Sequence, residues 1–148
     1  MVTPGAEEAR EVAVWNRAAG GDPVSDRQGD VALAHALRFL GYAEGDGLVS
    51  ALEHEEENEC VGTGSAAFLW FGLKDAARLV DEVAARRVEI VDGHLTADLR
   101  LAALEELEAD ADRGFGALSL GERLTAALRT ALAHRPECFA DQVHLTAA

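Results

Sequence analysis

Apolar residues recur every three or four positions along most of this chain, and glycine or proline breaks separate the segments with this spacing. Residues 74–87 give the clearest case. Their apolar positions follow the i, i+3, i+4, i+7, i+8 pattern of one helical face: Ala76, Leu79, Val80, Val83 and Ala84. A strand could not bury these positions together, because its side chains alternate between two faces. The sequence therefore predicts an all-α protein.

We expect about seven helices in a single compact domain that spans residues 1–148. The predicted helices are 6–19, 31–42, one that starts at Leu48 and exposes residues 54–59, 66–71, 74–87, 97 to about 112, and 120 to Pro136. Arg86 and Arg87 would then lie at a helix C-terminus, which favours positive charge. Residues 137–148 form a tail whose order the pattern leaves open.

Capping residues mark several helix ends. Ser65 is predicted to cap the N-terminus of the short fourth helix, and Gly72 to close it. Thr96 is predicted to cap the sixth helix, and Ser119 and Glu122 have the spacing of a capping box for the last one.

Residues 88–95 are the one strand-like segment. Asp92 and Gly93 can form a hairpin turn, but an isolated two-stranded hairpin is marginally stable. We therefore expect a short β-ribbon or a loop there.

Large apolar residues cover every side of the short fourth helix, where Phe68, Leu69, Trp70 and Phe71 are consecutive. A helix that is apolar all round is either deeply buried or part of a subunit contact. A homodimer through residues 68–71 is therefore an alternative to burial within one chain.

Acidic residues outnumber basic ones by 27 to 13, which gives a formal net charge of −14. This excludes nucleic-acid binding through a general basic surface, and anionic membranes should repel the chain. Its expected macromolecular partners are basic. The N-terminus has no signal-peptide pattern and no apolar run reaches the roughly 20 residues of a membrane span, so we expect a cytoplasmic protein, with Cys60 and Cys138 as reduced thiols.

Two segments carry this charge. Residues 44–59 contain seven acidic residues and no lysine or arginine, and residues 89–112 contain eight acidic residues and one arginine. Helical positions three or four apart share a face. Three stripes of carboxylates are therefore predicted: Glu53, Glu56 and Glu57; Glu105, Glu108 and Asp112; and Glu106 with Asp110.

These stripes have two interpretations. One is a solvated face that keeps the protein soluble. The other is a carboxylate array that imitates DNA, in which one phosphate charge occurs per ~1.7 Å of axis, whereas carboxylates one helical turn apart are ~5.4 Å apart. The candidate partner-binding residues are Glu53, Glu56, Glu57, Glu59, Glu105, Glu106, Glu108, Asp110 and Asp112.

Motifs for catalysis or metal binding are weak. Residues 62–65 lack the lysine of a phosphate-binding loop, no G-x-S-x-G nucleophile motif occurs, and residues 53–59 lack the pattern of a calcium loop. The neighbouring histidines and cysteines match no strong zinc spacing: His54 with Cys60, and His134 with Cys138 and His144. We expect no catalytic residue, metal site or cofactor, and so no enzyme.

Several short segments resemble one family. They are Val14–Arg17, Gly29-Asp30 before Leu33 and Leu37, the break at Gly45-Asp46-Gly47, Phe71–Leu73 leading into Ala76–Val80, Leu104–Glu108, and His134–Phe139. Over about residues 14 to 140 the chain resembles the all-helical family typified by DNA-mimic protein nineteen. That family typically has Asn-Gly-Gly at the break, whereas this chain has Gly45-Asp46-Gly47-Leu48. The resemblance implies an α-helical fold without catalytic activity, dimerisation, and an acidic surface for a DNA-binding protein such as a transcription regulator.

Three hypotheses follow. The first is a non-enzymatic protein whose acidic face sequesters a basic DNA-binding protein. The second is an immunity protein or antitoxin that neutralises a basic nuclease toxin. The third is a small-molecule-binding helical domain with an aromatic pocket around Trp15, Phe68, Trp70 and Phe71.

Overall fold

Helix α2, Gln28–Asp46, runs through the middle of the molecule and packs against helices that precede and follow it. The computed structural model describes residues 4–20 and 22–141. Within these residues there are seven α-helices, one short 3₁₀ helix and no strand, which confirms the all-α prediction. The other elements are α1 (Pro4–Ala18), α3 (Leu48–Glu57), α4 (Thr63–Trp70), α5 (Lys74–Asp92), α6 (Ala97–Gly116), α7 (Leu120–His134) and η1 (Pro136–Cys138).

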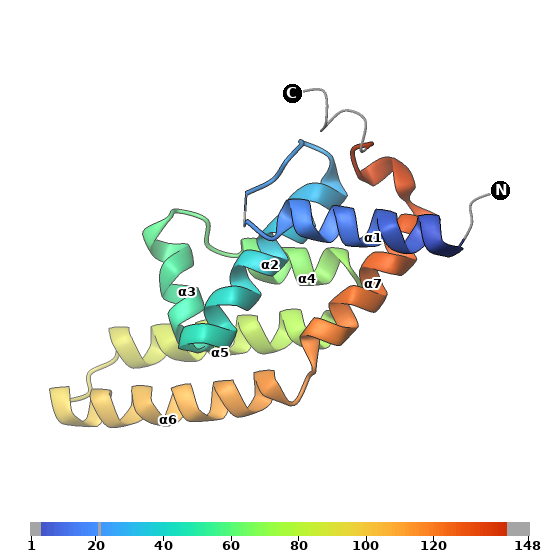
Figure 1. The fold of residues 1–148 in the computed structure, drawn as a ribbon. Coiled ribbons are helices and arrows are strands. Elements are labelled where there is room, and N and C mark those ends of the chain that lie inside the picture. Colours follow the sequence, from blue (N-terminus) through green and yellow to red (C-terminus); the bar gives the residue numbers. More distant parts are fainter. Residues whose placement is uncertain (1–3, 21, 142–148) are drawn as a thin grey trace.

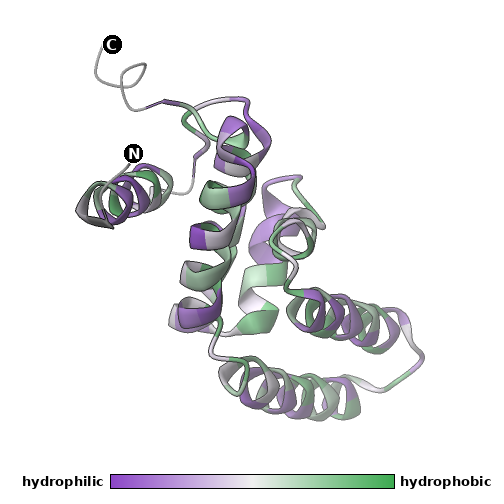
Figure 2. Cartoon of the chain, turned by 90° about the vertical axis from the view of Figure 1, so that its right-hand side faces the viewer, coloured by the Kyte–Doolittle hydropathy of each residue, from purple (hydrophilic) through white to green (hydrophobic). Residues whose placement is uncertain are grey.

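The helices form two groups around α2. Helices α5 and α6 make a long antiparallel hairpin, and α3 and α4 lie between this hairpin and α2 (Figure 1). Helices α1 and α7 pack on the opposite part of α2, away from the hairpin loop (Figures 1 and 2). Green hydrophobic stretches alternate with purple hydrophilic ones along α5, α6 and α7 in Figure 2, as the amphipathic pattern predicts.

The core lies where α2, α4 and α6 meet. The rings of Phe39, Phe68 and Phe115, one from each of these helices, contact one another with centroids 5.9, 6.3 and 6.5 Å apart. Phe68 has no exposed surface. Such ring pairs contribute about 0.5–1.5 kcal/mol each beyond the burial of their area. This cluster fixes the acidic half of the chain to the central helix.

A ribbon does not form at residues 88–95, because Val88–Asp92 continue α5. Extending an existing helix adds one hydrogen bond for each residue that is fixed, so no new nucleus is needed. Val88 and Val91 are exposed, so their β-branched side chains define no buried strand face. Arg87 is therefore in the interior of α5, whereas the sequence pattern placed it at the end.

Helix α2 extends beyond its predicted end at Tyr42 and contains two interior glycines. The helix passes Gly41 and Gly45 and ends only before Gly47, whose φ of 99° is unfavourable for other residues. An interior glycine costs a helix about 1 kcal/mol. The packing of α2 against α3 and α4 offsets this cost, since helix stability in proteins comes mainly from tertiary contacts.

Two of the predicted caps are confirmed. The Thr96 hydroxyl accepts a hydrogen bond from the backbone N–H of Leu99 at 3.4 Å. Gly72 has a φ of 78° and follows α4, and the next N–H, of Leu73, donates to the Phe68 carbonyl at 2.9 Å. This is the hydrogen-bond pattern of a glycine-closed helix end.

The other two predicted caps are wrong. Ser65 lies inside α4, which starts two residues earlier, and its buried hydroxyl donates to the Ala77 carbonyl at 3.3 Å. Ser119 precedes α7, but its φ is 49° and its side chain caps nothing. The tight turn from α6 into α7 imposes this left-handed conformation, and the extended conformation usual for an N-cap is lost.

The segment after α7 returns to the core. Pro136–Cys138 form η1, and Phe139 is 2% exposed. A Cβ atom at Gly29 would lie 2.5 Å from the Phe139 ring, so the start of α2 accommodates this ring only because residue 29 is glycine. Residues 137–141 of the predicted tail are thus part of the domain, and residues 142–148 lie outside the described residues.

Candidate acidic interface

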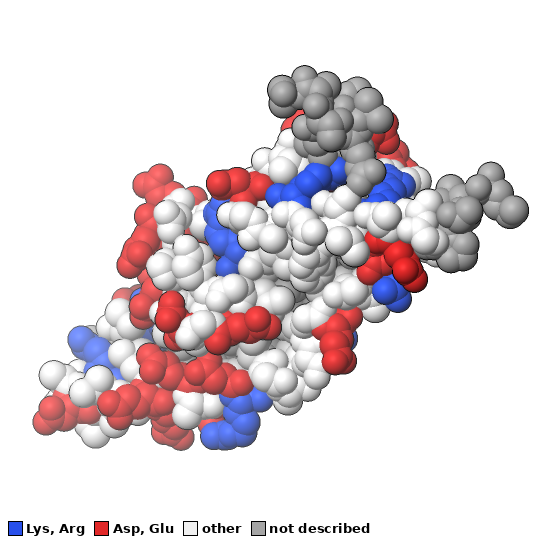
Figure 3. Space-filling model, in the orientation of Figure 1, with Lys and Arg blue, Asp and Glu red and all other residues white. Residues whose placement is uncertain are grey.

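The two acidic segments meet at one end of the molecule. Helix α3 packs against both α5 and α6. The Asp112 carboxylate of α6 accepts the backbone N–H of Leu48, the first residue of α3, at 2.9 Å. Acidic side chains consequently gather over α3 and α6 on the face shown in Figure 3. We call Glu53, Glu56, Glu57, Glu59, Glu105, Glu106, Glu108, Asp110 and Asp112 together the α3–α6 acidic surface.

Asp112 is exposed, but it also caps the N-terminus of α3. It satisfies one of the four backbone N–H groups that a helix N-terminus leaves without a partner in the helix, and its negative charge suits the positive end of the α3 dipole. A Cβ atom at Gly47 would come within 3.2 Å of its carboxylate. The Gly47 break and Asp112 therefore hold α3 beside α6.

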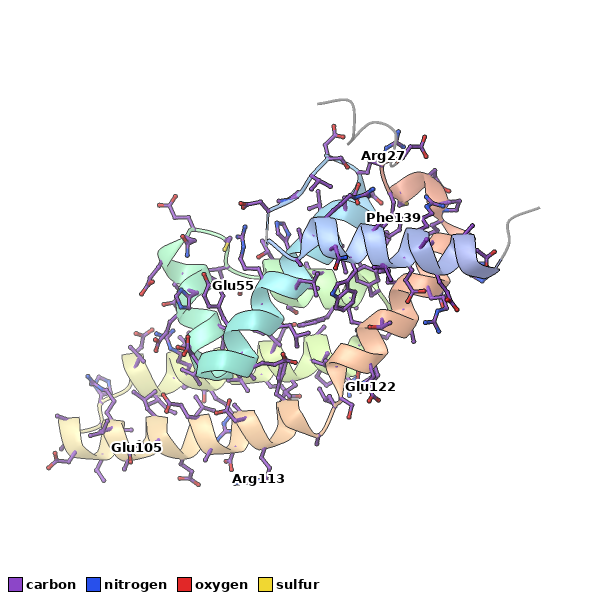
Figure 4. The ribbon with its side chains drawn as sticks, in the orientation of Figure 1. Arg27, Glu55, Glu105, Arg113, Glu122 and Phe139 are labelled. Atoms are coloured by element: carbon purple, nitrogen blue, oxygen red, sulfur yellow. The ribbon has the colours of Figure 1, made fainter. Side chains whose placement is uncertain are left out.

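Glu55 contradicts the prediction that residues 54–59 form one exposed face. Only 7% of Glu55 is exposed. Its carboxylate accepts hydrogen bonds from the backbone N–H of Gly64 at 2.8 Å, the Thr63 hydroxyl at 3.2 Å and the Gly62 N–H at 3.3 Å. It points from α3 to the first turn of α4 (Figure 4). One acid of this cluster is thus a buried cap for the next helix.

A sequence signal for Glu55 exists. It lies seven residues after Leu48 and three after Leu52, both buried, so it continues the apolar face of α3. The following Gly-Thr-Gly offers unpaired N–H groups at the start of a helix. An acid on an apolar face next to a helix start is typical of a buried cap, so this combination distinguishes Glu55 from its exposed neighbours.

Arginines of α5 reduce the charge of part of the surface. Arg87 donates to Glu56 at 2.6 Å and lies 3.9 Å from Glu53. Arg86 lies 3.9 Å from Asp110, which also pairs with Arg113 at 3.3 Å. Sequence reasoning missed the pairs of Arg86 and Arg87 because they depend on α5 passing beside α3 and α6. The Asp110–Arg113 pair is local, and its i, i+3 spacing was readable in the sequence.

Five members of the acidic surface have no basic side chain within ion-pair distance. Within residues 4–20 and 22–141, these exposed residues are Glu59, Glu105, Glu106, Glu108 and Asp112. Glu57 has only His54 nearby, at 3.9 Å. Neighbouring like charges on one helix destabilise it by a few tenths of a kcal/mol per pair. The strongest negative field of this surface therefore lies on α6 around Glu105, labelled in Figure 4.

The aromatic residues do not combine into a pocket. Phe68 and Phe71 are buried in the core, and Trp70 packs between Phe71, Phe139 and the Arg135 guanidinium, which lies 3.9 Å from its ring centroid. Of the segment proposed for a dimer contact, Leu69 is 55% exposed. Among the described residues, one surface hollow is bordered by Arg38 and Tyr42 and another by Glu44 and Glu122, and the aromatic residues of the predicted pocket line neither.

Comparisons with protein-family models, with curated proteins and with solved structures give no match to this chain. Among the described residues, no three His, Cys, Asp or Glu side chains lie together as a metal site would require. No described helix is both long enough and apolar enough to cross a membrane.

Proposed function

We propose that this chain is a non-enzymatic interaction protein that binds and sequesters a basic DNA-binding protein, such as a transcription regulator, through the α3–α6 acidic surface. The observation that carries this proposal is the pairing of α3 with α6, which brings acids from two distant segments to one end of the molecule. The sequence resemblance to the DNA-mimic protein nineteen family supports the same partner class.

The spacing of the carboxylates on this chain suits a partner surface that normally binds DNA phosphates. Glu105, Glu108 and Asp112 recur about once per helical turn, and Glu106 and Asp110 form a second row beside them. One row alone supplies about one third of the axial charge density of duplex DNA. The additional rows of carboxylates on α6 and α3 raise this charge density. A DNA-binding groove lined with Lys and Arg would therefore meet a negative field comparable to that of DNA.

Capture of the partner tests this proposal. The tagged chain is used to retrieve proteins from the source cells at about 0.15 M salt and again at about 1 M salt. Electrostatic binding should weaken strongly at the higher salt, because charges of an exposed interface are screened. The retrieved protein should be basic, and duplex DNA should compete with the chain for it.

Matched variants localise the contact. Replacing Glu105, Glu106 and Glu108 by Gln removes three charges from α6, and replacing Glu7, Glu8 and Glu122 by Gln removes three exposed charges elsewhere. The first variant should lose the partner and the second should keep it. Equal effects of the two variants, a neutral partner, or binding that ignores salt would refute the proposal. A captured nuclease would favour an immunity protein.

A further inference from the structure

No other element among residues 4–20 and 22–141 covers the free half of the α5–α6 hairpin. The last buried residue of α5 is Val83, and the first of α6 is Leu107. Between them, five large apolar side chains are between 39% and 58% exposed: Val88, Val91, Leu95, Leu99 and Leu101. White side chains accordingly reach the surface among red ones at this end of the molecule (Figure 3). Clustered exposed apolar side chains indicate an interaction site.

Contacts with α3 show which of these side chains share a side of the hairpin. Arg87 reaches α3 by its ion pair with Glu56, so Arg87 marks the side of α5 that faces α3. Val91 lies one helical turn beyond Arg87 on this side, whereas Val88 directly follows Arg87 and is turned about 100° away from it. The side of α5 that α3 covers near the core thus continues as an uncovered apolar surface toward the loop.

The contact of Asp112 shows which face of α6 is directed toward α3. Asp112 faces α3, because it binds the N–H of Leu48. Leu101 lies about three turns before Asp112 on the same face, with Glu105 and Glu108 between them. Leu101 therefore lies on the same side of the hairpin as Val91. We call Val91 and Leu101, with Val88 at their edge, the apolar shelf.

Carboxylates border the apolar shelf on two sides. Helix α6 contributes Glu105 and Glu108, which have no basic neighbour in the described part of the chain. The last turn of α3 contributes Glu56 and Glu57. A partner segment that fits must be apolar on one side and basic on its flanks.

We propose that the apolar shelf binds an amphipathic helix with Leu-type residues on one face and Lys or Arg beside them, supplied by the basic partner. Such a helix would bury its apolar face against α5 and α6 and place its cations against Glu57, Glu105 and Glu108. This inference rests on the proposed function, which supplies the class of partner, a basic DNA-binding protein. It adds that the partner binds with a helix and that part of the contact is apolar. A second copy of this chain fits less well, because it would bring its own carboxylates against these.

Peptide binding to the full chain tests the proposal. The probe is a fluorescein-labelled 18-residue Lys/Leu peptide with leucines at i, i+3, i+4 and i+7, and the matched peptide has the same composition with its leucines spread around the helix. Fluorescence anisotropy at about 0.15 M salt gives the dissociation constants. The amphipathic peptide should bind about tenfold more tightly, because only it can bury several leucines on the shelf.

Exposed apolar residues elsewhere provide matched protein variants. Val91→Ser with Leu101→Ser should abolish the tenfold preference, whereas Val12→Ser with Leu69→Ser should leave it unchanged. All four positions are exposed, so circular dichroism should show unchanged helicity. Sedimentation of the unmodified chain reports its oligomeric state under the same conditions.

The outcomes separate the two proposals. Equal binding of both peptides, or an unchanged preference in Val91→Ser with Leu101→Ser, overturns the apolar shelf and leaves the acidic surface as an electrostatic site. Failure of both peptides to bind overturns the shelf, and the partner capture then decides the proposed function by itself. A dimer that dissociates on Val91→Ser with Leu101→Ser also overturns the inference, since a second copy would then occupy the shelf.

Discussion

Replacing Asp30 by asparagine should destabilise the whole domain, although this residue is far from the acidic surface. Asp30 is 1% exposed. Its Oδ1 accepts from Arg17 at 3.1 Å, and its Oδ2 accepts from the Ser25 hydroxyl at 2.6 Å and from the Ala140 N–H at 2.8 Å. It thus joins α1, the start of α2 and the segment after η1. An asparagine amide keeps the shape, but its NH₂ must face one of these donors.

The magnitude follows from the burial of both charges. Arg17 is 13% exposed, and its Nε and Nη1 have no hydrogen-bond partner among the described atoms, so Asp30 is its main source of compensation. Removing one partner of a buried ion pair costs about 3–5 kcal/mol. We expect Asp30→Asn to lower the free energy of unfolding by about 3 kcal/mol, a large part of the ~5–15 kcal/mol of a typical domain. The melting temperature should fall by about 10 °C.

Urea unfolding followed by circular dichroism measures this loss, with an unchanged dependence on urea concentration. Asp26→Asn is the matched control, because Asp26 is exposed and only four residues away. Arg17→Met combined with Asp30→Asn should cost less than the sum of the single changes, since neither charge then remains buried alone. A loss below about 1 kcal/mol for Asp30→Asn, or strict additivity, would show that the two charges are not coupled as argued.

Three further predictions concern other buried groups. Glu55→Gln should lower the free energy of unfolding by about 2 kcal/mol, because the first turn of α4 loses its anionic cap. The control variant Glu57→Gln, at an exposed position, should change this free energy little. Chemical denaturation measures both variants. Burial, and then the positive charge of Arg38, lowers the pKa of His35 below its usual value of about 6.5. The stability linked to neutral His35 is therefore present above about pH 6.5 and is lost as the pH falls through the lowered pKa. NMR titration of the His35 imidazole measures this pKa. A pKa above 6.5 would contradict the prediction. Phe139→Ala should cost about 3–5 kcal/mol in thermal unfolding, and a loss below 1 kcal/mol would show that the segment after η1 is not part of the core.

The helical face patterns predicted the number and type of helices, but the helix ends depended on contacts. Leu101, Leu104 and Leu107 looked alike in the sequence pattern, yet only Leu107 is fully buried, because no other helix covers the free end of the hairpin. The predicted helix ended at Tyr42, before a break at Gly45-Asp46-Gly47, but α2 continues past Gly45 to Asp46 because α3 and α4 pack on it.

For the candidate acidic residues too, local spacing predicted part of the arrangement and tertiary contacts decided the rest. Local spacing predicted that Glu105 and Glu108 share a face, and both are exposed on α6. It did not distinguish Glu55, which caps α4, from Glu56, which pairs with Arg87. These roles depend on which helix lies opposite, and that information is absent from i, i+3 and i+4 positions.

By itself, the sequence determined that the chain is all-helical and that its net charge of −14 resides in two segments. Both properties are local, because helical periodicity and charge are set by residues close together in the chain. Only the tertiary structure decided that α3 lies against α6, that Asp30 and Glu55 are buried, and that the hairpin tip is uncovered. Those outcomes come from packing and from hydrogen bonds between distant residues, where burial decides whether a carboxylate caps a helix, pairs with arginine or faces water.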